Sequence, residues 1–374
     1  MKVAYFVHDL DDAAVRRRVR MLRAGGCEVA VLGFRRADAP IDQVEGIPAI
    51  DLGQTHNARL AQRAGAVAVN LLKAGRLKVQ VTDADVVLAR NLECLALAAW
   101  ARALHAPGAS LVYECLDIHR TLLGTGLKSK ALRAVERGLL ARCAQVIVSS
   151  PAFVERYFAP RQDCRAPVLL VENKVLADMA VPARPDLGAA SAGPPWRIGW
   201  FGMIRCRKSL DLLTRLVERG DGLIEVVIRG RPSYDILSDF DAVVERTPGL
   251  RFGGPYRSEE LPDLYRGVHF TWAVDYFEEG LNSSWLLPNR LYEGGLNGVP
   301  AIALGQVETG RWLARRGAGV LISDPEGELP AFFERLTEDD YVRRRRATSA
   351  IPLSDLVADR ADCRRLATSL GGAR

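Results

Sequence analysis

Short apolar runs alternate with amphipathic stretches along most of this chain. Residues 3–7 are apolar, a stretch with Val15, Val19 and Leu22 at helical spacing follows, and residues 29–34 are again largely apolar. Short apolar runs are typical of buried strands, and spacings of three and four are typical of helices with one apolar face. The order strand, helix, strand predicts a βαβ unit with parallel strands and a helix on one face of the sheet.

The same alternation continues through both halves of the chain. Further apolar runs that predict strands lie at residues 85–89, 111–116, 145–148, 168–171, 197–201, 223–228, 250–252, 269–274 and 299–303. Residues 182–195 (PARPDLGAASAGPP) lack periodicity and are rich in Pro, Gly, Ala and Ser, which indicates an interdomain linker. The pattern predicts an α/β protein with two doubly wound domains, residues 1–181 and 196–350, and a C-terminal segment, residues 351–374, that holds a last helix.

Composition narrows the class of protein. With 374 residues, 48% hydrophobic and 26% charged, the chain has globular values and enough length for two cores. Its seven cysteines include no pair with C-x-x-C spacing, which favours reduced thiols over disulfides or a zinc site. No apolar run approaches the roughly 20 residues of a membrane span, and the apolar run near residue 1 is too short for a signal peptide. We therefore expect a cytoplasmic protein, either free or peripheral at the inner face of the cell membrane.

The net charge of +6 indicates anionic partners. Nucleic acid is the least favoured of these, because the chain has no recognised binding motif and no basic stripe interleaved with aromatic residues. Residues 58–77 and 128–143 are helical patterns with basic residues. They are interpreted either as solvated helix faces or as contacts with an anionic membrane surface.

The most specific stretch is residues 286–303 (LLPNRLYEGGLNGVPAIA), which predicts a loop, a short helix, a glycine turn and a buried strand. Pro288 suits the first turn of a helix, and Gly298 suits the left-handed residue that ends one. A helix N-terminus favours phosphate. Arg290 and Glu293 share a helix face, so one can meet a phosphate and the other the hydroxyls of a ribose. The alternative is an ordinary capped helix with an ion pair between these two side chains.

This stretch resembles the Pro-Asn-Lys-Leu-(Tyr/Phe)-Glu signature of nucleotide-sugar glycosyltransferases with the GT-B architecture, especially family-4-like enzymes of exopolysaccharide and surface-polysaccharide synthesis. The resemblance extends in outline over the whole chain. It implies two Rossmann-like domains facing a cleft, with the C-terminal helix packing back on the first. It also implies a hexosyltransferase that uses a UDP or GDP sugar and a saccharide acceptor. The basic helical patterns at residues 58–77 and 128–143 favour a lipid-linked acceptor at the cytoplasmic membrane. Such enzymes usually need no bound metal or cofactor.

The turn at residues 202–209 resembles the family's Gly-Arg-Leu-x-x-x-Lys-Gly loop, which holds the donor diphosphate. Met203 replaces the arginine of that loop, so either Arg205 or Arg207 is expected to supply the missing charge. The first acid of the family's E-x₇-E pattern falls on Trp285, a departure that leaves the donor sugar open. The predicted donor-binding residues are Gly202, Arg205, Arg207, Lys208, Asn282, Ser283, Asn289, Arg290 and Glu293.

Asp117 and His119 follow an apolar strand, where parallel sheets bind their ligands. His119 matches a histidine that similar enzymes carry, and Asp117 can orient it or act as a base. If the reaction inverts, one of them deprotonates the acceptor; if it retains, as the resemblance favours, the departing phosphate can serve as the base. A histidine bonded to backbone is the alternative for His119. Further acceptor-side candidates are His8, Asp9, Asp11, Arg90 and Asn91.

Other classes of protein stay open or are disfavoured. Neither the G-x-G-x-x-G fingerprint nor P-loop spacing occurs, which disfavours dinucleotide dehydrogenases and P-loop enzymes. The histidines show no metal-ligand spacing. Two rivals share the proposed scaffold: a nucleotide-sugar 2-epimerase, and a non-catalytic protein that binds a nucleotide or glycan, for which Met203 and Trp285 are the best evidence.

Overall fold

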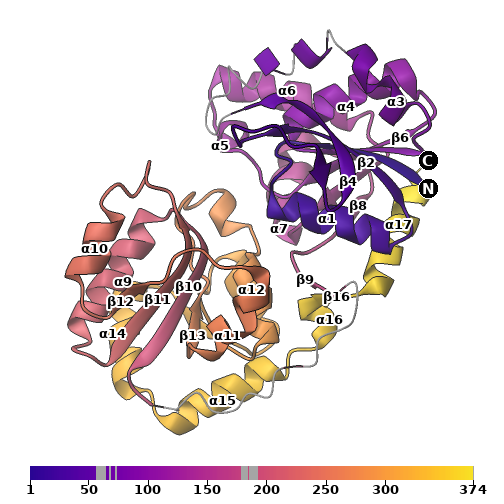
Figure 1. Ribbon diagram of the computed structural model, residues 1–374. Helices are drawn as coiled ribbons and strands as arrows, with labels where there is room; N and C mark the ends of the chain where they lie inside the picture. The colour runs from indigo at the N-terminus through magenta and orange to yellow at the C-terminus, as the bar shows by residue number, and fades with distance from the viewer. Residues whose placement is uncertain (56–64, 67–68, 72–73, 178–183, 185–192, 374) are drawn as a thin grey trace. The chain divides into compact units, whose positions relative to one another are not determined.

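The computed structural model describes residues 1–55, 65–66, 69–71, 74–177, 184 and 193–373 (Figure 1). Most of the predicted linker and about half of the predicted helix at residues 58–77 therefore lie outside the described residues. The chain forms two compact units. The first contains residues 1–172, 176–181 and 358–374, and the second contains residues 173–175 and 182–357.

The first unit is built on an eight-stranded sheet of order β3-β4-β2-β1-β5-β6-β7-β8, parallel except for the β3–β4 pair. Its strands are β1 (Lys2–Val7), β2 (Glu28–Arg35), β3 (Gln43–Val44), β4 (Ile47–Gln54), β5 (Val86–Arg90), β6 (Ser110–Cys115), β7 (Gln145–Val148) and β8 (Val168–Leu170). The described helices are α1 (Ala13–Ala24), η1 (Ala74–Leu77), α3 (Lys78–Val81), α4 (Leu92–His105), α5 (Arg120–Leu123), α6 (Leu127–Leu140), α7 (Pro151–Phe153), η2 (Val154–Phe158), α8 (Ala159–Gln162) and α17 (Arg360–Gly372).

The second unit is built on a six-stranded parallel sheet of order β12-β11-β10-β13-β14-β15. Its strands are β10 (Trp196–Ile204), β11 (Ile224–Pro232), β12 (Leu250–Phe252), β13 (Phe270–Trp272), β14 (Ala301–Leu304) and β15 (Val320–Ile322). Its helices are α9 (Arg207–Arg219), α10 (Phe240–Arg246), η3 (Ser258–Glu260), α11 (Leu261–Arg266), η4 (Asn282–Ser284), α12 (Asn289–Leu296), α13 (Glu308–Ala314), α14 (Pro325–Arg335), α15 (Glu338–Ser349) and α16 (Leu353–Leu356). Two short strands, β9 (Val175–Leu176) and β16 (Val357–Ala358), pair with each other.

Both predicted doubly wound domains are confirmed, because in each sheet the chain crosses to both sides of its first strand. In the second unit, β10 is flanked by β11 and β13, and its side chains Trp196, Ile198 and Trp200 are fully buried. Strands that are covered by helices on both faces consist almost entirely of apolar residues. For this reason, the apolar runs in the sequence predicted the positions of most strands.

The C-terminal helix packs on the first unit, as predicted from the resemblance, and contacts α1 there. Helix α17 begins at the capping residue Asp359 and buries Cys363, Leu366 and Leu370. A Cβ added to Gly25, at the end of α1, would lie 2.4 Å from the carbonyl oxygen of Cys363, so the two backbones are in close contact. The helix starts later than residue 355, where the sequence pattern placed it, because α16 and β16 occupy residues 353–358.

A buried charge network lies beneath the ends of β1, β5 and β6. The fully buried carboxylate of Glu114 accepts hydrogen bonds from Arg18 Nε (2.5 Å), Arg90 Nε (2.7 Å) and the Tyr5 hydroxyl (2.5 Å). Burial opposes ionisation of Glu114, but the two guanidinium groups outweigh it and lower its pKa to about 2. The network therefore holds ionised groups in the core of the first unit.

Candidate functional site

The motif at residues 286–303 folds as the predicted helix, turn and strand. Helix α12 ends at Leu296 and is capped by Asn297, Gly298 follows with φ +65°, and the chain enters β14. A left-handed residue at this position favours glycine. Pro288 is the residue that caps the helix (φ −74°, ψ 151°), so the helix begins one residue later than expected, at Asn289.

Arg290 and Glu293 lie on the first two turns of α12 and are both half-buried. One guanidinium nitrogen of Arg290 donates to the carbonyl oxygen of Val274, just beyond β13, at 3.3 Å. Oε2 of Glu293 accepts a hydrogen bond from the hydroxyl of Tyr265 at 3.1 Å. The two side chains are thus held by neighbouring elements of the same unit, near the carboxyl ends of its strands.

Two tyrosines near Glu293 were not predicted from the sequence. Tyr265 is fully buried, and burial together with the nearby Glu293 carboxylate raises its pKa well above the ordinary value. Tyr256 is partly buried, and burial and the same carboxylate raise its pKa as well. The ring of Phe201 packs against both, with centroid distances of 5.1 Å to Tyr265 and 6.4 Å to Tyr256. No local sequence pattern indicates these contacts, since Phe201 lies on β10, Tyr265 on α11 and Glu293 on α12.

The last residues of β10 pass very close to the last residues of β11. Gly202 (φ +112°) and Gly230 (φ +138°) are partners in the sheet, and a Cβ on Gly230 would lie 1.8 Å from the carbonyl oxygen of Gly202. Any other residue at position 230 would clash with this backbone. The predicted match of Gly202 to the diphosphate loop thus coincides with a place where two backbones meet.

The basic residues that follow Gly202 separate into two groups. Arg205 lies over the ring of Phe277 at 4.4 Å, and Lys208 lies over the ring of Tyr276 at 4.1 Å. Lys208 Nζ also donates to both carboxylate oxygens of Glu279, at 2.8 and 2.9 Å.

Arg207 contacts a different part of the unit, through an ion pair with Asp239 and a 3.7 Å approach to Asp211. The loop at residues 275–281 therefore gathers Arg205 and Lys208 but not Arg207. Of the two arginines that the sequence left open, Arg205 is the one beside Lys208.

The predicted sugar-contacting residues brace this same loop. Ser283 Oγ accepts a hydrogen bond from the backbone N–H of Glu278 at 2.9 Å, and Asn282 and Ser283 are buried. Trp285, at the position where the family has its first acid, is also buried. Asn289, in contrast, is exposed at the start of α12.

Asp117 and His119 follow β6 in the first unit. His119 caps α5, with Nδ1 accepting a hydrogen bond from the backbone N–H of Thr121 at 3.2 Å. A neutral imidazole that accepts at Nδ1 carries its proton on Nε2 and can donate from there. Asp117 is exposed and lies two residues earlier in the same loop. The hydrogen bond at Nδ1 therefore leaves Nε2 of His119 as the nitrogen that can donate.

The acceptor-side candidates after β1 and β5 differ in their surroundings. Asp11 forms an ion pair with Arg16, and His8 Nε2 lies 3.9 Å from a carboxylate oxygen of Asp12. Asp9 is half-buried, and burial raises the pKa of its carboxyl.

Arg90 and Asn91 form the junction between β5 and α4. Arg90 is buried in the Glu114 network and also donates to the carbonyl oxygen of Ala14 at 3.1 Å, so protein groups account for its contacts. Asn91 adopts φ +70° and ψ 160°, a region essentially limited to glycine, which costs of order 1–3 kcal/mol. Such strain at a strand end is typical of functional sites, which favours Asn91 over Arg90 as an acceptor-side residue.

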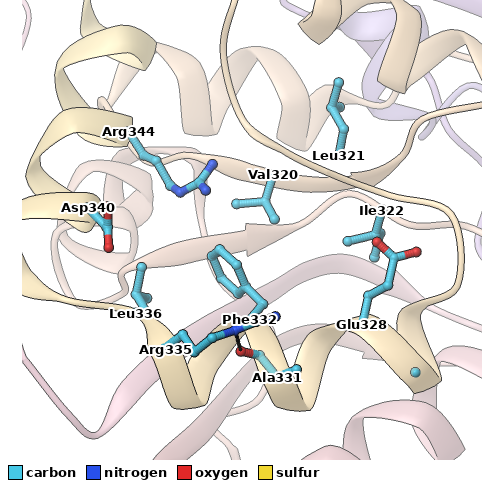
Figure 2. Close-up of a pocket in the computed structure, with 11 residues that line it drawn as sticks. Val320, Leu321, Ile322, Glu328, Ala331, Phe332, Arg335, Leu336, Asp340 and Arg344 are labelled. Carbon is cyan, nitrogen blue, oxygen red and sulfur yellow. Dashed lines mark hydrogen bonds between the residues drawn. The ribbon is translucent and has the colours of Figure 1, made fainter.

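A cavity of about 500 Å³ lies elsewhere in the second unit, beside the edge strand β15 (Figure 2). Its walls include Val320, Phe332, Arg335 and Arg344. None of the predicted site residues lines it. Within the described residues, no cluster of three or more His, Cys, Asp or Glu side chains is arranged to hold a metal, and no helix is long and apolar enough to cross a membrane.

Two doubly wound parallel units, with a last helix that returns to the first, define the GT-B glycosyltransferase fold. HepE of Anabaena, solved with UDP and with UDP-glucose, matches 100% of both chains in its UDP complex (TM-score 0.70, 15% identity). The sucrose-phosphate synthase of Thermosynechococcus elongatus matches 99% of this chain and 95% of its own (TM-score 0.70, 14% identity). The predicted GT-B fold is confirmed.

The chain belongs to the family of the succinoglycan biosynthesis protein ExoL of Rhizobium meliloti (strain 1021). The two are 44% identical over 375 residues, which cover 99% of this chain and 93% of the relative. No protein-family model matches the chain.

Proposed function

We propose that this protein is a glycosyltransferase that moves a hexose from a nucleotide-diphosphate sugar to a saccharide acceptor during exopolysaccharide synthesis. The observation that carries this proposal is the joint placement of Arg290, Glu293 and the loop around Arg205 and Lys208 in one Rossmann-like unit. The UDP and UDP-glucose held by HepE favour a UDP sugar as the donor. The relative named for succinoglycan biosynthesis favours a polysaccharide product.

In this proposal the leaving diphosphate is stabilised by cationic side chains. Arg290, Arg205 and Lys208 approach the phosphates, while the carboxylate of Glu293 accepts hydrogen bonds from the ribose hydroxyls. The bond from the sugar C1 to the phosphate oxygen breaks, and a bond from C1 to the acceptor oxygen forms. The acceptor proton passes to the departing phosphate if the configuration is retained, or to Asp117 if it is inverted.

The acceptor is proposed to be a lipid-linked saccharide at the cytoplasmic face of the membrane. Helix α6 supports this, because it carries Lys128, Lys130 and Arg137 on its exposed side. His8, Asp9, Asn91, Asp117 and His119 follow strands of the same unit and are the side chains proposed to meet the acceptor hydroxyls.

A non-catalytic nucleotide-binding protein is the second candidate, since Met203 is exposed where the family has arginine and Trp285 is buried where it has an acid. Such a protein would bind the nucleotide without turning over any sugar donor. A 2-epimerase would instead convert its donor with no acceptor present. Incubating the protein with UDP-sugars alone, and analysing the products by chromatography, separates the three: slow hydrolysis indicates the transferase, a new epimer the epimerase, and no change the binding protein.

Nucleotide binding itself is tested by thermal unfolding with UDP, GDP, ADP and CMP. A nucleoside diphosphate at about 100 times its Kd should add about 2.7 kcal/mol to the free energy of unfolding, which is visible as a rise in Tm. We expect the largest rise with UDP. No shift with any of the four would contradict the proposed donor site.

Lys208 and Glu279 give a second test, because the donor diphosphate has to compete with Glu279 for this ammonium group. The ion pair is about half exposed, so breaking it costs little stability. Glu279→Gln should bind UDP several-fold more tightly than the unaltered protein, and Lys208→Ala about tenfold more weakly. Titration calorimetry measures both.

Arg207→Ala is the matched control for this test, since Arg207 is engaged with Asp239. We expect its affinity for UDP to stay within about twofold of the unaltered protein. A loss as large as that of Lys208→Ala would place Arg207, rather than Arg205, beside the diphosphate.

A further inference from the structure

Three helices of the first unit form one outer layer. Helix α4 packs on β1, β5 and β6 and contacts both α3 and α6, and Figure 1 shows α4 between the other two. Large apolar side chains remain exposed on all three helices: Val79, Trp100, Leu104, Leu127 and Val135. Leu127 is 84% exposed and Trp100 is 48% exposed. Single apolar residues on a surface are ordinary, but five on adjoining helices form a patch that needs an explanation.

Helix α6 has an unusual distribution of residue types. Its exposed side carries Leu127, Ala131, Val135 and Gly138, which recur every three or four residues and therefore share one face. Its only acidic residue, Glu136, points into the core instead, where its carboxylate accepts hydrogen bonds from the hydroxyls of Tyr113 and Tyr157 and the side-chain amide of Gln162. The outer face of α6 is thus apolar and basic with no negative charge.

The helices of this layer share this bias. Within η1, α3, α4 and α6, every exposed charged side chain is basic: Arg76, Lys78, Lys128, Lys130 and Arg137. The exposed acids Asp83 and Asp85 lie after the end of α3. The two acids of these elements, Glu93 and Glu136, are half-buried and buried respectively. Exposed apolar side chains on helices whose exposed charges are basic are complementary to acyl chains beneath anionic headgroups.

We propose that this surface of α3, α4 and α6 docks on an anionic lipid bilayer. Trp100, Leu104 and Leu127 enter the headgroup region, and the lysines of α6 contact the lipid phosphates. The amount of exposed lysine favours lipid over a protein partner, because stable protein interfaces are depleted of lysine. The proposal rests on the proposed function in one respect: docking would bring the acceptor-binding unit close to a lipid-linked saccharide. The docking itself requires no donor or acceptor.

Vesicle sedimentation with the full chain tests this proposal. We expect the protein to sediment at low salt with vesicles of phosphatidylglycerol and phosphatidylcholine in equal parts, and to remain in solution with phosphatidylcholine alone. High salt should release it, because the lysine contacts are screened. Lys128→Glu combined with Lys130→Glu should weaken binding more than about tenfold, and Trp100→Ala several-fold.

Control variants make the same change in net charge, or remove an exposed apolar side chain, at another place on the protein. Arg246→Glu combined with Arg346→Glu changes two exposed charges on α10 and α15, and Leu321→Ala removes an exposed apolar side chain from β15. Both controls should bind vesicles like the unaltered protein. Unchanged Tm and unchanged UDP affinity in every variant show that neither folding nor the donor site is affected.

Several results would overturn the proposal. These are a failure of the unaltered protein to sediment with the anionic vesicles, equal binding to neutral vesicles, or equal loss in the controls. Concentration-dependent self-association that Trp100→Ala abolishes, without vesicle binding, would assign the patch to a contact between two copies. UDP binding is measured separately, so the docking surface and the donor site can fail independently.

Discussion

Replacing Glu293 by alanine should lower the affinity for UDP by about a hundredfold or more. Glu293 is proposed to accept two hydrogen bonds from ribose hydroxyls, and hydrogen bonds to a charged group contribute about 1.5–3 kcal/mol each. Alanine also leaves the buried hydroxyl of Tyr265 without the carboxylate to which it donates. Titration calorimetry measures the affinity, and release of free sugar from UDP-sugars measures the associated loss of turnover.

Two further variants show whether the effect belongs to the carboxylate. Tyr265→Phe keeps the ring and removes the hydroxyl that holds Glu293, so it should weaken UDP binding only several-fold. Glu334→Ala removes an exposed carboxylate from α14 and should leave binding unchanged. If Glu293→Ala bound UDP as the unaltered protein does, Glu293 would not belong to the nucleotide site.

Glu114→Gln should be the most destabilising conservative change in the first unit, at about 3–5 kcal/mol of unfolding free energy. Glutamine has nearly the same shape, but it leaves the buried guanidinium groups of Arg18 and Arg90 without a counter-charge. Denaturant unfolding, followed by a probe in each unit, measures the loss. Asp83→Ala, which removes an exposed partner of Lys2 at 3.6 Å, is the control and should cost less than about 1 kcal/mol.

The same carboxylate gives an acid dependence whose sign follows from its lowered pKa. Glu114 has a pKa of about 2 in the folded protein against an ordinary 4.5, so its contribution to stability is fully present above pH 4.5. That contribution is lost as the pH falls from 4.5 towards 2. The Glu114→Gln variant should lack this part of the acid dependence. An equally steep loss in both proteins would show that other carboxylates dominate acid unfolding.

The strand and helix pattern was largely predictable, because the residues of a buried parallel strand form a continuous apolar run in the sequence. The motif around Arg290 was also readable, since Pro288, Gly298 and the spacing to Glu293 all lie within one short stretch. The neighbours of these residues were not predictable. Tyr265 reaches Glu293 from a separate helix, α11, and Glu279 reaches Lys208 from a loop 71 residues away in the chain.

The buried charges were equally hidden from sequence reasoning. Glu114 is the second-last residue of β6 and Arg90 is the last residue of β5. In the sequence, each therefore resembles an ordinary polar residue near the end of a strand. Only the pairing of these adjacent strands brings the two side chains together. For the same reason Arg90 was expected on the acceptor side, although its guanidinium is bound within the core.

Helix α17 has a consequence for the order in which the protein is made. Because residues 358–374 belong to the same unit as residues 1–172, the first unit lacks part of its core until residues 358–374 have been synthesised. Residues 182–357 are synthesised before residues 358–374, so the second unit can fold while α1 still lacks its contact with α17. Although most of the first unit is synthesised before the second, we therefore expect the first unit to complete its folding after the second.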